Sequence, residues 1–120
     1  MPVIEIENIT KNNLAYRQGV YYDLNVQIVL MSLNIGEEIG AEIHENSTQI
    51  IRIESGSAKV IINDQSYIVG QGQLIVIHPG ALHNVINISE TDLKLYTIYS
   101  PPIHEPRVFQ VDKPENEDDF

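Results

Sequence analysis

The chain has 120 residues, of which 42% are hydrophobic, and its formal net charge at pH 7 is −10. This length predicts a single domain, and the negative charge argues against a nucleic-acid partner, whose phosphates it would repel. The absence of cysteine excludes disulfides and thiolate metal sites. No apolar run approaches the roughly 20 residues that cross a bilayer, and the acidic N-terminus lacks the basic region of a signal peptide. We therefore expect a cytoplasmic protein with no membrane partner.

Short β-type runs separated by turn residues follow one another about every ten residues. In residues 1–19 the pattern is weak, with an edge strand expected at 3–6 and a turn at 12–13. Beyond it we expect a long run at 20–33 and strands at 39–44, 49–53, 59–62, 66–69, 73–77, 82–87 and 93–99. The run at 73–77 is apolar throughout, which is typical of a buried strand. No segment has a helical period, so the pattern predicts an all-β sandwich or barrel without a helix longer than about two turns.

Polar side chains with metal-binding chemistry gather near the middle of the chain. A strand over 39–44 would place Glu42 and His44 on one face, with Ile39, Ala41 and Ile43 on the other. A polar turn at 46–48 would then return the chain, so a hairpin would bring the next polar side chain, at position 49, close to the Glu-His pair.

The stretch around this pair resembles the first motif of the cupin superfamily. That motif is a Gly, five residues, His-X-His, three or four residues, Glu, six residues and a Gly. Gly36 and Gly56 stand at its two ends with the right spacing. Glu42 occupies the position of the usual first His, His44 that of the second, and Gln49 that of the usual Glu.

A second stretch resembles the second cupin motif, which is a Gly, five residues, Pro-X-Gly, two residues, His, three residues and Asn. Gly72, Gly80, His83 and Asn87 fit this pattern, while His78 takes the usual Pro position. Two motifs in the right order are far more specific than a lone His-X-His pair. The resemblance narrows further to small single-domain cupins that are loosely labelled mannose-6-phosphate isomerase-like, a subgroup that the segment 93–102 also resembles.

The resemblance implies a cupin-type double-stranded β-helix, or jelly-roll barrel, as one domain over residues 1–120. Its core would cover about 20–100, with an N-terminal strand or arm at 1–19 and a C-terminal arm with an acidic tail at 101–120. The metal-ligand positions fall on Glu42, His44, Gln49 and His83. Two imidazoles and a carboxylate suit one divalent ion such as zinc, manganese, iron or nickel. The alternative is an empty site in which the inward polar residues bond one another.

Other candidate residues surround this set. His78 is a candidate acid or base, or a hydrogen-bond partner of the ligands, or a plain loop residue; Asn87 is a further candidate partner of the ligands. His104 is expected on the surface arm or as a lid over a pocket. Tyr96 and Tyr99 face opposite sides of the last strand, so at most one lines a pocket. Arg52 should point away from Gln49, as a surface or dimer-face charge.

Three functions remain open at this stage. The first is a metal-dependent enzyme acting on a small oxygenated molecule such as a sugar, with isomerase-like or epimerase-like chemistry. The second is an iron-dependent dioxygenase, and the third is a cupin that binds a metal or small ligand without catalysis. No Lys or Arg falls beside the proposed ligands on the inward face, which favours a neutral sugar or a keto acid over a sugar phosphate. We also expect a homodimer, because jelly rolls leave sheet edges that an N-terminal strand or C-terminal arm of a partner could cover.

Overall fold

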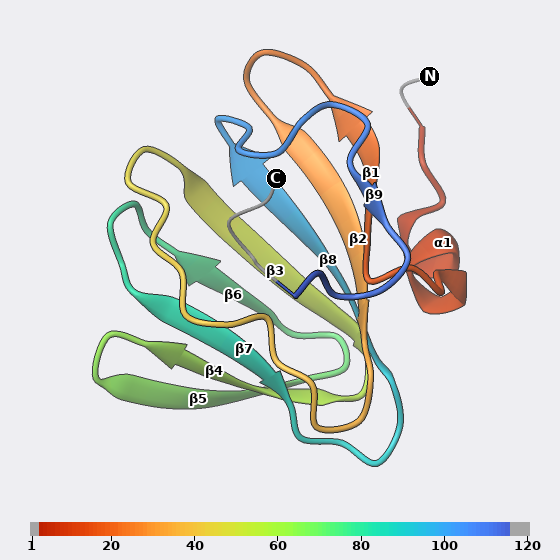
Figure 1. Cartoon of the computed structure of the whole chain (residues 1–120), viewed down its shortest axis with the longest axis vertical. Coiled ribbons are helices and arrows are strands. Elements are labelled where there is room, and N and C mark those ends of the chain that lie inside the picture. Colours follow the sequence, from red (N-terminus) through yellow and green to blue (C-terminus); the bar gives the residue numbers. More distant parts are fainter. Residues whose placement is uncertain (1–2, 116–120) are drawn as a thin grey trace.

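The computed structural model describes residues 3–115 (Figure 1). These residues form α1 (Ile6–Asn12), β1 (Arg17–Tyr22), β2 (Gln27–Leu33), β3 (Thr48–Ser55), β4 (Ser57–Ile62), β5 (Gln65–Gly70), β6 (Leu74–Ile77), β7 (His83–Asn87), β8 (Leu93–Ser100) and β9 (Phe109–Gln110). The strands pair antiparallel in a large sheet, β6-β3-β8-β2-β1-β9, and a small sheet, β5-β4-β7. The two sheets enclose one interior, which confirms the predicted all-β jelly roll. Within the described residues no helix is long and apolar enough to span a bilayer.

The register of the large sheet fixes which side chains share a level of the interior. Gln27 on β2 lies opposite Tyr99 on β8, which lies opposite Gln49 on β3. Because side chains alternate between faces, the next inward levels are two and four residues further along. They consist of Val29, Thr97 and Ile51, and then of Met31, Leu95 and Ile53. The barrel is therefore polar at the end where β8 finishes and mostly apolar below it.

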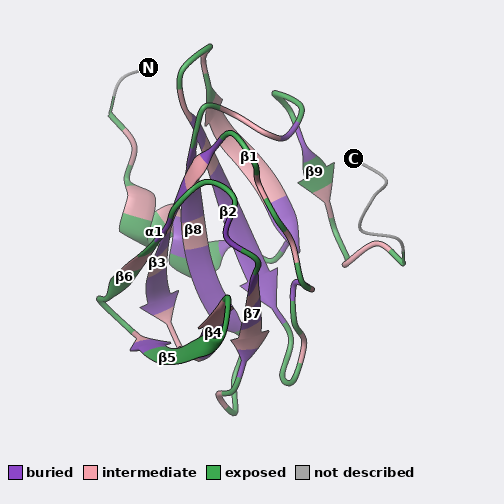
Figure 2. Ribbon diagram, turned by 90° about the vertical axis from the view of Figure 1, so that its left-hand side faces the viewer, coloured by how far each residue is buried: buried purple, intermediate pink, exposed green. Residues whose placement is uncertain are grey.

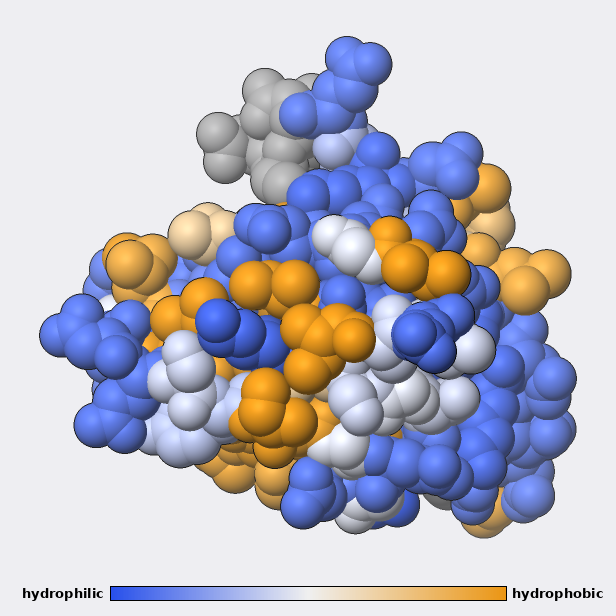
Figure 3. Space-filling view, turned by 90° about the horizontal axis from the view of Figure 1, so that it is seen from below, coloured by the Kyte–Doolittle hydropathy of each residue, from blue (hydrophilic) through white to orange (hydrophobic). Residues whose placement is uncertain are grey.

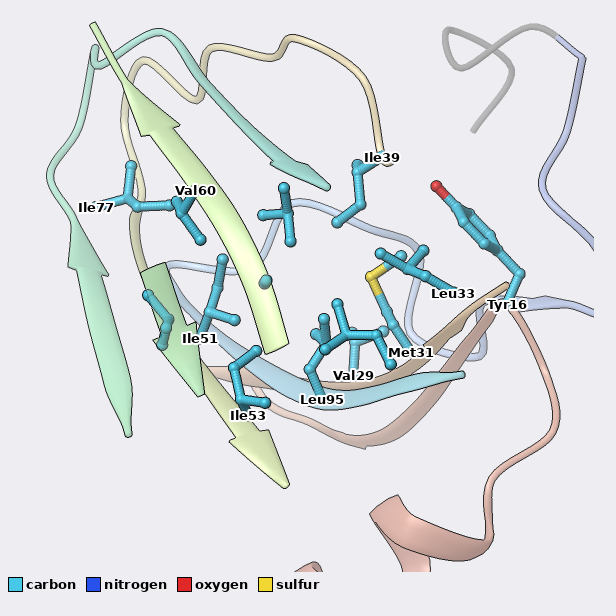
Figure 4. Close-up of a cluster of buried hydrophobic side chains, with 14 of the residues drawn as sticks. Tyr16, Val29, Met31, Leu33, Ile39, Ile51, Ile53, Val60, Ile77 and Leu95 are labelled. Carbon is cyan, nitrogen blue, oxygen red and sulfur yellow. The ribbon is translucent and has the colours of Figure 1, made fainter. Parts of the chain in front are cut away.

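The apolar part of the interior is a packed core to which both sheets contribute. Val60 of the small sheet and Ile51 and Met31 of the large sheet are all 0% exposed. Figure 4 shows side chains from both sheets pointing into this shared interior. Burying a side chain of this size stabilises a fold by about 1.5–3 kcal/mol. The polar end of the barrel therefore lies next to a stable, packed core.

The N-terminal region differs from the prediction, because the edge strand expected at 3–6 does not form and residues 6–12 form helix α1. The helix packs on the outer face of the large sheet (Figure 1) and buries Thr10. An exposed pair four residues apart, Lys11 Nζ and Glu7 Oε2 at 2.7 Å, adds a small local stabilisation. The seven residues of α1 make about two turns, and a helix this short with one buried side chain has no apolar stripe that a sequence pattern could reveal.

Two predicted strands also take a different form. The run at 20–33 is divided into β1 and β2 by a turn in which Asp23 Oδ1 accepts from the N–H groups of Asn25 and Val26. The strand β6, predicted to be buried, is an edge strand, and Leu74 and Val76 are 55% and 53% exposed. Figure 2 shows β5 and β6 as the exposed side of a molecule whose β2 and β8 are buried. An apolar run alone does not reveal how many neighbouring strands it has.

The C-terminal arm folds back onto its own barrel. The strand β8 ends at Ser100, before Pro101 and Pro102, as predicted. The chain then crosses the barrel end to pair β9 with β1, and the Gly19 N–H donates to the Val108 carbonyl at 2.8 Å. A Cβ at position 19 would lie 3.2 Å from Val108 Cγ1, so glycine permits this close approach. The arm thus covers an edge of its own sheet, and most of the predicted acidic tail lies outside the described residues.

Candidate metal centre

The segment that carries Glu42 and His44 is extended but is not a regular strand. It pairs with β7 only through isolated bridges, one of which joins Glu42 to His83. Gly40 has a φ of +108°, a conformation that favours glycine. This residue breaks the predicted alternation, so that Ile39 is 4% exposed while Ile43 is 48% exposed. Beyond this break, Glu42 and His44 both point inward.

The bridge between Glu42 and His83 sets the two residues side by side. The N–H of each donates to the carbonyl of the other at 2.9 Å. The side chains of Glu42 and His44 are 16% and 11% exposed, and His83 is 3% exposed. The bridge and the start of β7 therefore deliver three polar side chains to the polar end of the barrel.

The ligand atoms of Glu42, His44 and His83 all lie within 4.8 Å of one another. Glu42 Oε1 is 3.6 Å from His44 Nε2, and the two imidazole centroids are 5.0 Å apart at an interplanar angle of 56°. Metal bonds to nitrogen or oxygen are about 2.0–2.2 Å, so two ligands of one ion lie up to about 4.4 Å apart. The observed spacing fits one ion after small side-chain rotations.

His83 is held in the tautomer that a metal ligand needs. Its Nδ1 lies 3.0 Å from the Ala81 carbonyl, and because a carbonyl only accepts, Nδ1 carries the proton and Nε2 keeps its lone pair. Burial, the main cause, lowers the pKa of His83 and keeps the ring neutral. The Nε2 atoms of His83 and His44 are buried without a hydrogen-bond partner among the described residues. His83 thus has the usual arrangement of a ligating histidine, in which the second ring nitrogen is hydrogen-bonded to a carbonyl.

The predicted fourth residue, Gln49, reaches the same end of the barrel by another route. Its strand β3 pairs with β6 and β8, so the predicted hairpin with the Glu42 segment does not form. Gln49 Nε2 donates to Thr97 Oγ1 at 3.0 Å and to the Tyr99 hydroxyl at 3.3 Å. Its Oε1 is buried with no hydrogen-bond partner in the described part of the chain. Tyr99 connects Gln49 to the trio, because its ring centroid is 5.8 Å from that of His44.

Comparison with known proteins decides the family. Residues 29–99 match the cupin domain family. The chain is a cupin. It is 42% identical over 109 residues to the uncharacterised protein YrkC of Bacillus subtilis, a match that covers 85% of this chain and 58% of that protein. It is 41% identical over 118 residues to the uncharacterised protein L612 of Acanthamoeba polyphaga mimivirus, covering 95% and 74%.

A solved structure supports the same assignment. The crystal structure of BH2720 from Bacillus halodurans superposes with a TM-score of 0.92 at 36% identity, over 94% of this chain and 91% of that chain. The chain spans only 58% of the length of its Bacillus subtilis relative. The names of these three proteins state no activity, so the mannose-6-phosphate isomerase-like label finds no support in them.

His104 was expected on a surface arm or lid, but in this cupin it lies inside the barrel. It is 5% exposed, and its ring centroid is 5.2 Å from that of Tyr99. Burial, together with the nearby charges of Arg17 and His44, lowers the pKa of His104 to about 3. Of the two tyrosines on β8, only Tyr99 is buried, as the alternation predicted.

A buried cation, Arg17, also lies inside the cupin, and the sequence pattern did not reveal it. Arg17 lies opposite Met31 in the β1–β2 register, which turns its side chain inward, and it is 1% exposed. Its Nη1 donates to Gln110 Oε1 at 2.6 Å, and its guanidinium lies 5.0 Å from the Tyr16 ring centroid. The pattern gave no strand at this position, so its inward direction could not be predicted. Arg17 therefore adds one positive charge to the barrel interior. The expectation that no Lys or Arg lies beside the proposed ligands stays a prediction.

Asn87 has a structural role instead of the predicted contact with the ligands. Its Nδ2 donates to the carbonyls of Leu33, Asn34 and Thr91 at 2.9–3.1 Å, and its Oδ1 accepts from Ser89. The amide therefore ties together two loops at the end of β7 opposite His83. All of its hydrogen-bonding capacity is used there.

Two further candidates lie on the surface. His78 is exposed, with its Nδ1 3.1 Å from the Pro79 carbonyl, and it is not part of the convergent trio. Arg52 lies on the outer side of β3, where its Nε is 3.5 Å from Glu54 Oε1. That position agrees with the predicted direction away from Gln49.

Proposed function

We propose that this cupin binds one divalent metal ion through Glu42, His44 and His83, with the amide oxygen of Gln49 as a fourth, neutral ligand. The observation that carries the proposal is the convergence of three ligand atoms within 4.8 Å at the polar end of the barrel. Two imidazoles and one carboxylate suit zinc, iron, manganese or nickel.

The alternative of an empty site, in which inward polar groups satisfy each other, fits the structure less well. Three polar atoms at this end, His44 Nε2, His83 Nε2 and Gln49 Oε1, have no hydrogen-bond partner among the described residues. Leaving a buried polar atom unpaired costs about 1–3 kcal/mol. A single cation, bound through the Nε2 lone pair of each imidazole and through the amide oxygen, would satisfy all three atoms.

We propose further that the bound metal serves chemistry on a small oxygenated metabolite such as a sugar, of the isomerase or epimerase type. Only Glu42 among the four ligands is anionic, so a divalent ion here would keep a net positive charge. Such a centre binds and stabilises enolate, diolate or carboxylate oxygens. His78 stays a candidate acid or base, although its exposed position requires the substrate to extend out of the barrel.

One observation keeps iron-dependent oxygen chemistry as a second candidate. Glu42, His44 and His83 form a two-histidine, one-carboxylate set, which is the ligand type of non-haem iron oxygenases. The preferred metal distinguishes this candidate from the first.

The test combines metal preference with two reactions. Metal-free protein would be titrated calorimetrically with zinc, manganese, nickel and, without oxygen, ferrous iron. The loaded forms would then be incubated with aldoses and ketoses in deuterated water, followed by NMR, and with oxygen, followed by an oxygen electrode. Deuterium incorporation next to a sugar carbonyl supports isomerase-like function, and oxygen uptake by the iron form supports the second candidate. Metal binding without either reaction would leave a non-catalytic metal-binding cupin.

We also propose that the cupin is a homodimer, although the structure removes the original reason for expecting one, since the arm covers its own sheet. The better candidate surface is formed by β5 and β6, where Ile68 is 65% and Leu74 is 55% exposed. Residues 65–77 contain no charged side chain in a chain of net charge −10, so two copies could meet there without repulsion. Figure 3 looks onto the face that carries β5 and shows apolar side chains gathered at its centre. The cytoplasmic location and the lack of a nucleic-acid partner stay predictions.

A further inference from the structure

The C-terminal arm is attached to the barrel by a clamp built on one buried side chain, Gln27, which is 0% exposed. Gln27 Oε1 accepts from the N–H groups of Ile103 at 3.3 Å and His104 at 3.0 Å. Gln27 Nε2 donates to the carbonyls of His104 at 3.2 Å and Glu105 at 3.1 Å. Four hydrogen bonds thus fix the backbone on both sides of His104.

The position of the clamp decides what His104 touches. Gln27 lies directly opposite Tyr99 in the β2–β8 register, so backbone fixed by Gln27 places the His104 ring against the Tyr99 ring. The two centroids are 5.2 Å apart at 77°. Edge-to-face aromatic pairs of this kind contribute about 0.5–1.5 kcal/mol beyond their buried area, enough to select one orientation of the tyrosine ring.

Tyr99 in turn touches two of the four proposed ligands. Its ring lies edge-on to His44, with centroids 5.8 Å apart at 89°, and its hydroxyl accepts from Gln49 Nε2 at 3.3 Å. The His44 ring then neighbours the His83 ring at 5.0 Å. A continuous row of four rings therefore runs from the arm to the candidate metal centre.

We propose that His104 is a positioning residue of the metal centre, which acts through Tyr99 to orient His44 and Gln49, and that the C-terminal arm is thereby part of the site. This inference rests on the proposed metal binding. Burial keeps the pKa of His104 near 3, so the ring supports Tyr99 without adding a positive charge beside the ion. Loss of a supporting partner of this kind commonly weakens metal binding by about 10–100-fold, and an effect relayed through Tyr99 should fall near the lower end.

The experiment uses cobalt(II), whose visible spectrum reports the geometry of its ligands. Metal-free full-length protein would be titrated with cobalt for the wild type and for His104→Ala, His104→Phe, Gln27→Ala and the control Lys113→Met. Lys113 also ties the arm to the barrel, through the Glu38 carbonyl, but does not touch the row of rings. We expect shifted absorption bands and roughly 10-fold weaker cobalt binding for His104→Ala and Gln27→Ala. His104→Phe keeps a ring and should keep the wild-type bands, as should Lys113→Met.

The outcomes separate this proposal from the metal site itself. Wild-type bands and affinity in both His104→Ala and Gln27→Ala would overturn the positioning role while leaving the metal site intact. If His104→Ala does not fold, Gln27→Ala, which leaves every ring in place, decides the question alone. Absence of cobalt binding by the wild type would refute the metal centre and the role of His104 with it.

Discussion

Gly40 offers a test of how the backbone places Glu42 and His44. Its φ of +108° lies where residues with a side chain are strained, and a Cβ there would have no heavy atom within 4 Å. Gly40→Ala therefore adds strain without a steric clash, at a cost of about 1–2 kcal/mol. In the metal-free variant the segment can relax to relieve that strain. Metal binding must then force the residue at position 40 back into the strained conformation, which costs binding free energy. The affinity for zinc should then fall by a factor of about 5–30.

The matched control is Gly72→Ala, in the loop between β5 and β6. Gly72 has a φ of +83° and equally open surroundings, but it lies outside the candidate metal centre. Urea unfolding of the metal-free proteins should show a smaller loss of stability in Gly40→Ala, whose segment relaxes, than in Gly72→Ala, whereas zinc calorimetry should show weaker binding only in Gly40→Ala. Wild-type zinc affinity in Gly40→Ala would refute the idea that this residue directs the two ligands inward.

Three more predictions concern the ligands, pH and assembly. Gln49→Ala should weaken zinc binding but not abolish it, since water can replace a neutral donor; a calorimetric loss as large as in His83→Ala would contradict this. The pKa of His104 is about 3 in the folded protein and about 6.5 when unfolded, so only the unfolded chain gains this proton between those values. The metal-free protein should therefore lose up to about 1.4 kcal/mol of stability per pH unit as pH falls through this window, measured by urea unfolding at pH 7 and 5; an equal loss in His104→Phe would exclude His104 as the cause. Light scattering at micromolar concentration should give the mass of a dimer, and Leu74→Glu should shift it towards a monomer; a monomeric wild type would end the dimer proposal.

The sequence predicted those parts of the fold and site that depend on local pattern and motif spacing. Short β-type runs between turn residues identified most strands, and period-two alternation showed that Tyr96 and Tyr99 face opposite sides of their strand. Motif spacing located Glu42, His44 and His83, which the structure brings together. These features follow from neighbours close in the chain, where a pattern has direct physical meaning.

The features that the sequence did not reveal depend on long-range pairing. His104 is buried because Gln27, 77 residues earlier, fixes its backbone, and nothing near Pro101–Pro102 signals that contact. Arg17 points inward because β1 pairs with β2 in one register, and a one-residue slip would have turned it outward. Gly40 is a local feature, yet the sequence does not say that its φ is positive.

Metal content tests the central claim most directly. Wild type and His83→Ala would be purified without added metal, loaded with zinc, dialysed at pH 7.5 and measured by elemental analysis. His83 supplies a neutral, pre-oriented Nε2, and its backbone bridge to Glu42 survives the substitution, so the variant should fold and yet lose its zinc. The account predicts about one ion per wild-type chain and far less in His83→Ala. Equal zinc content in the two proteins would contradict it.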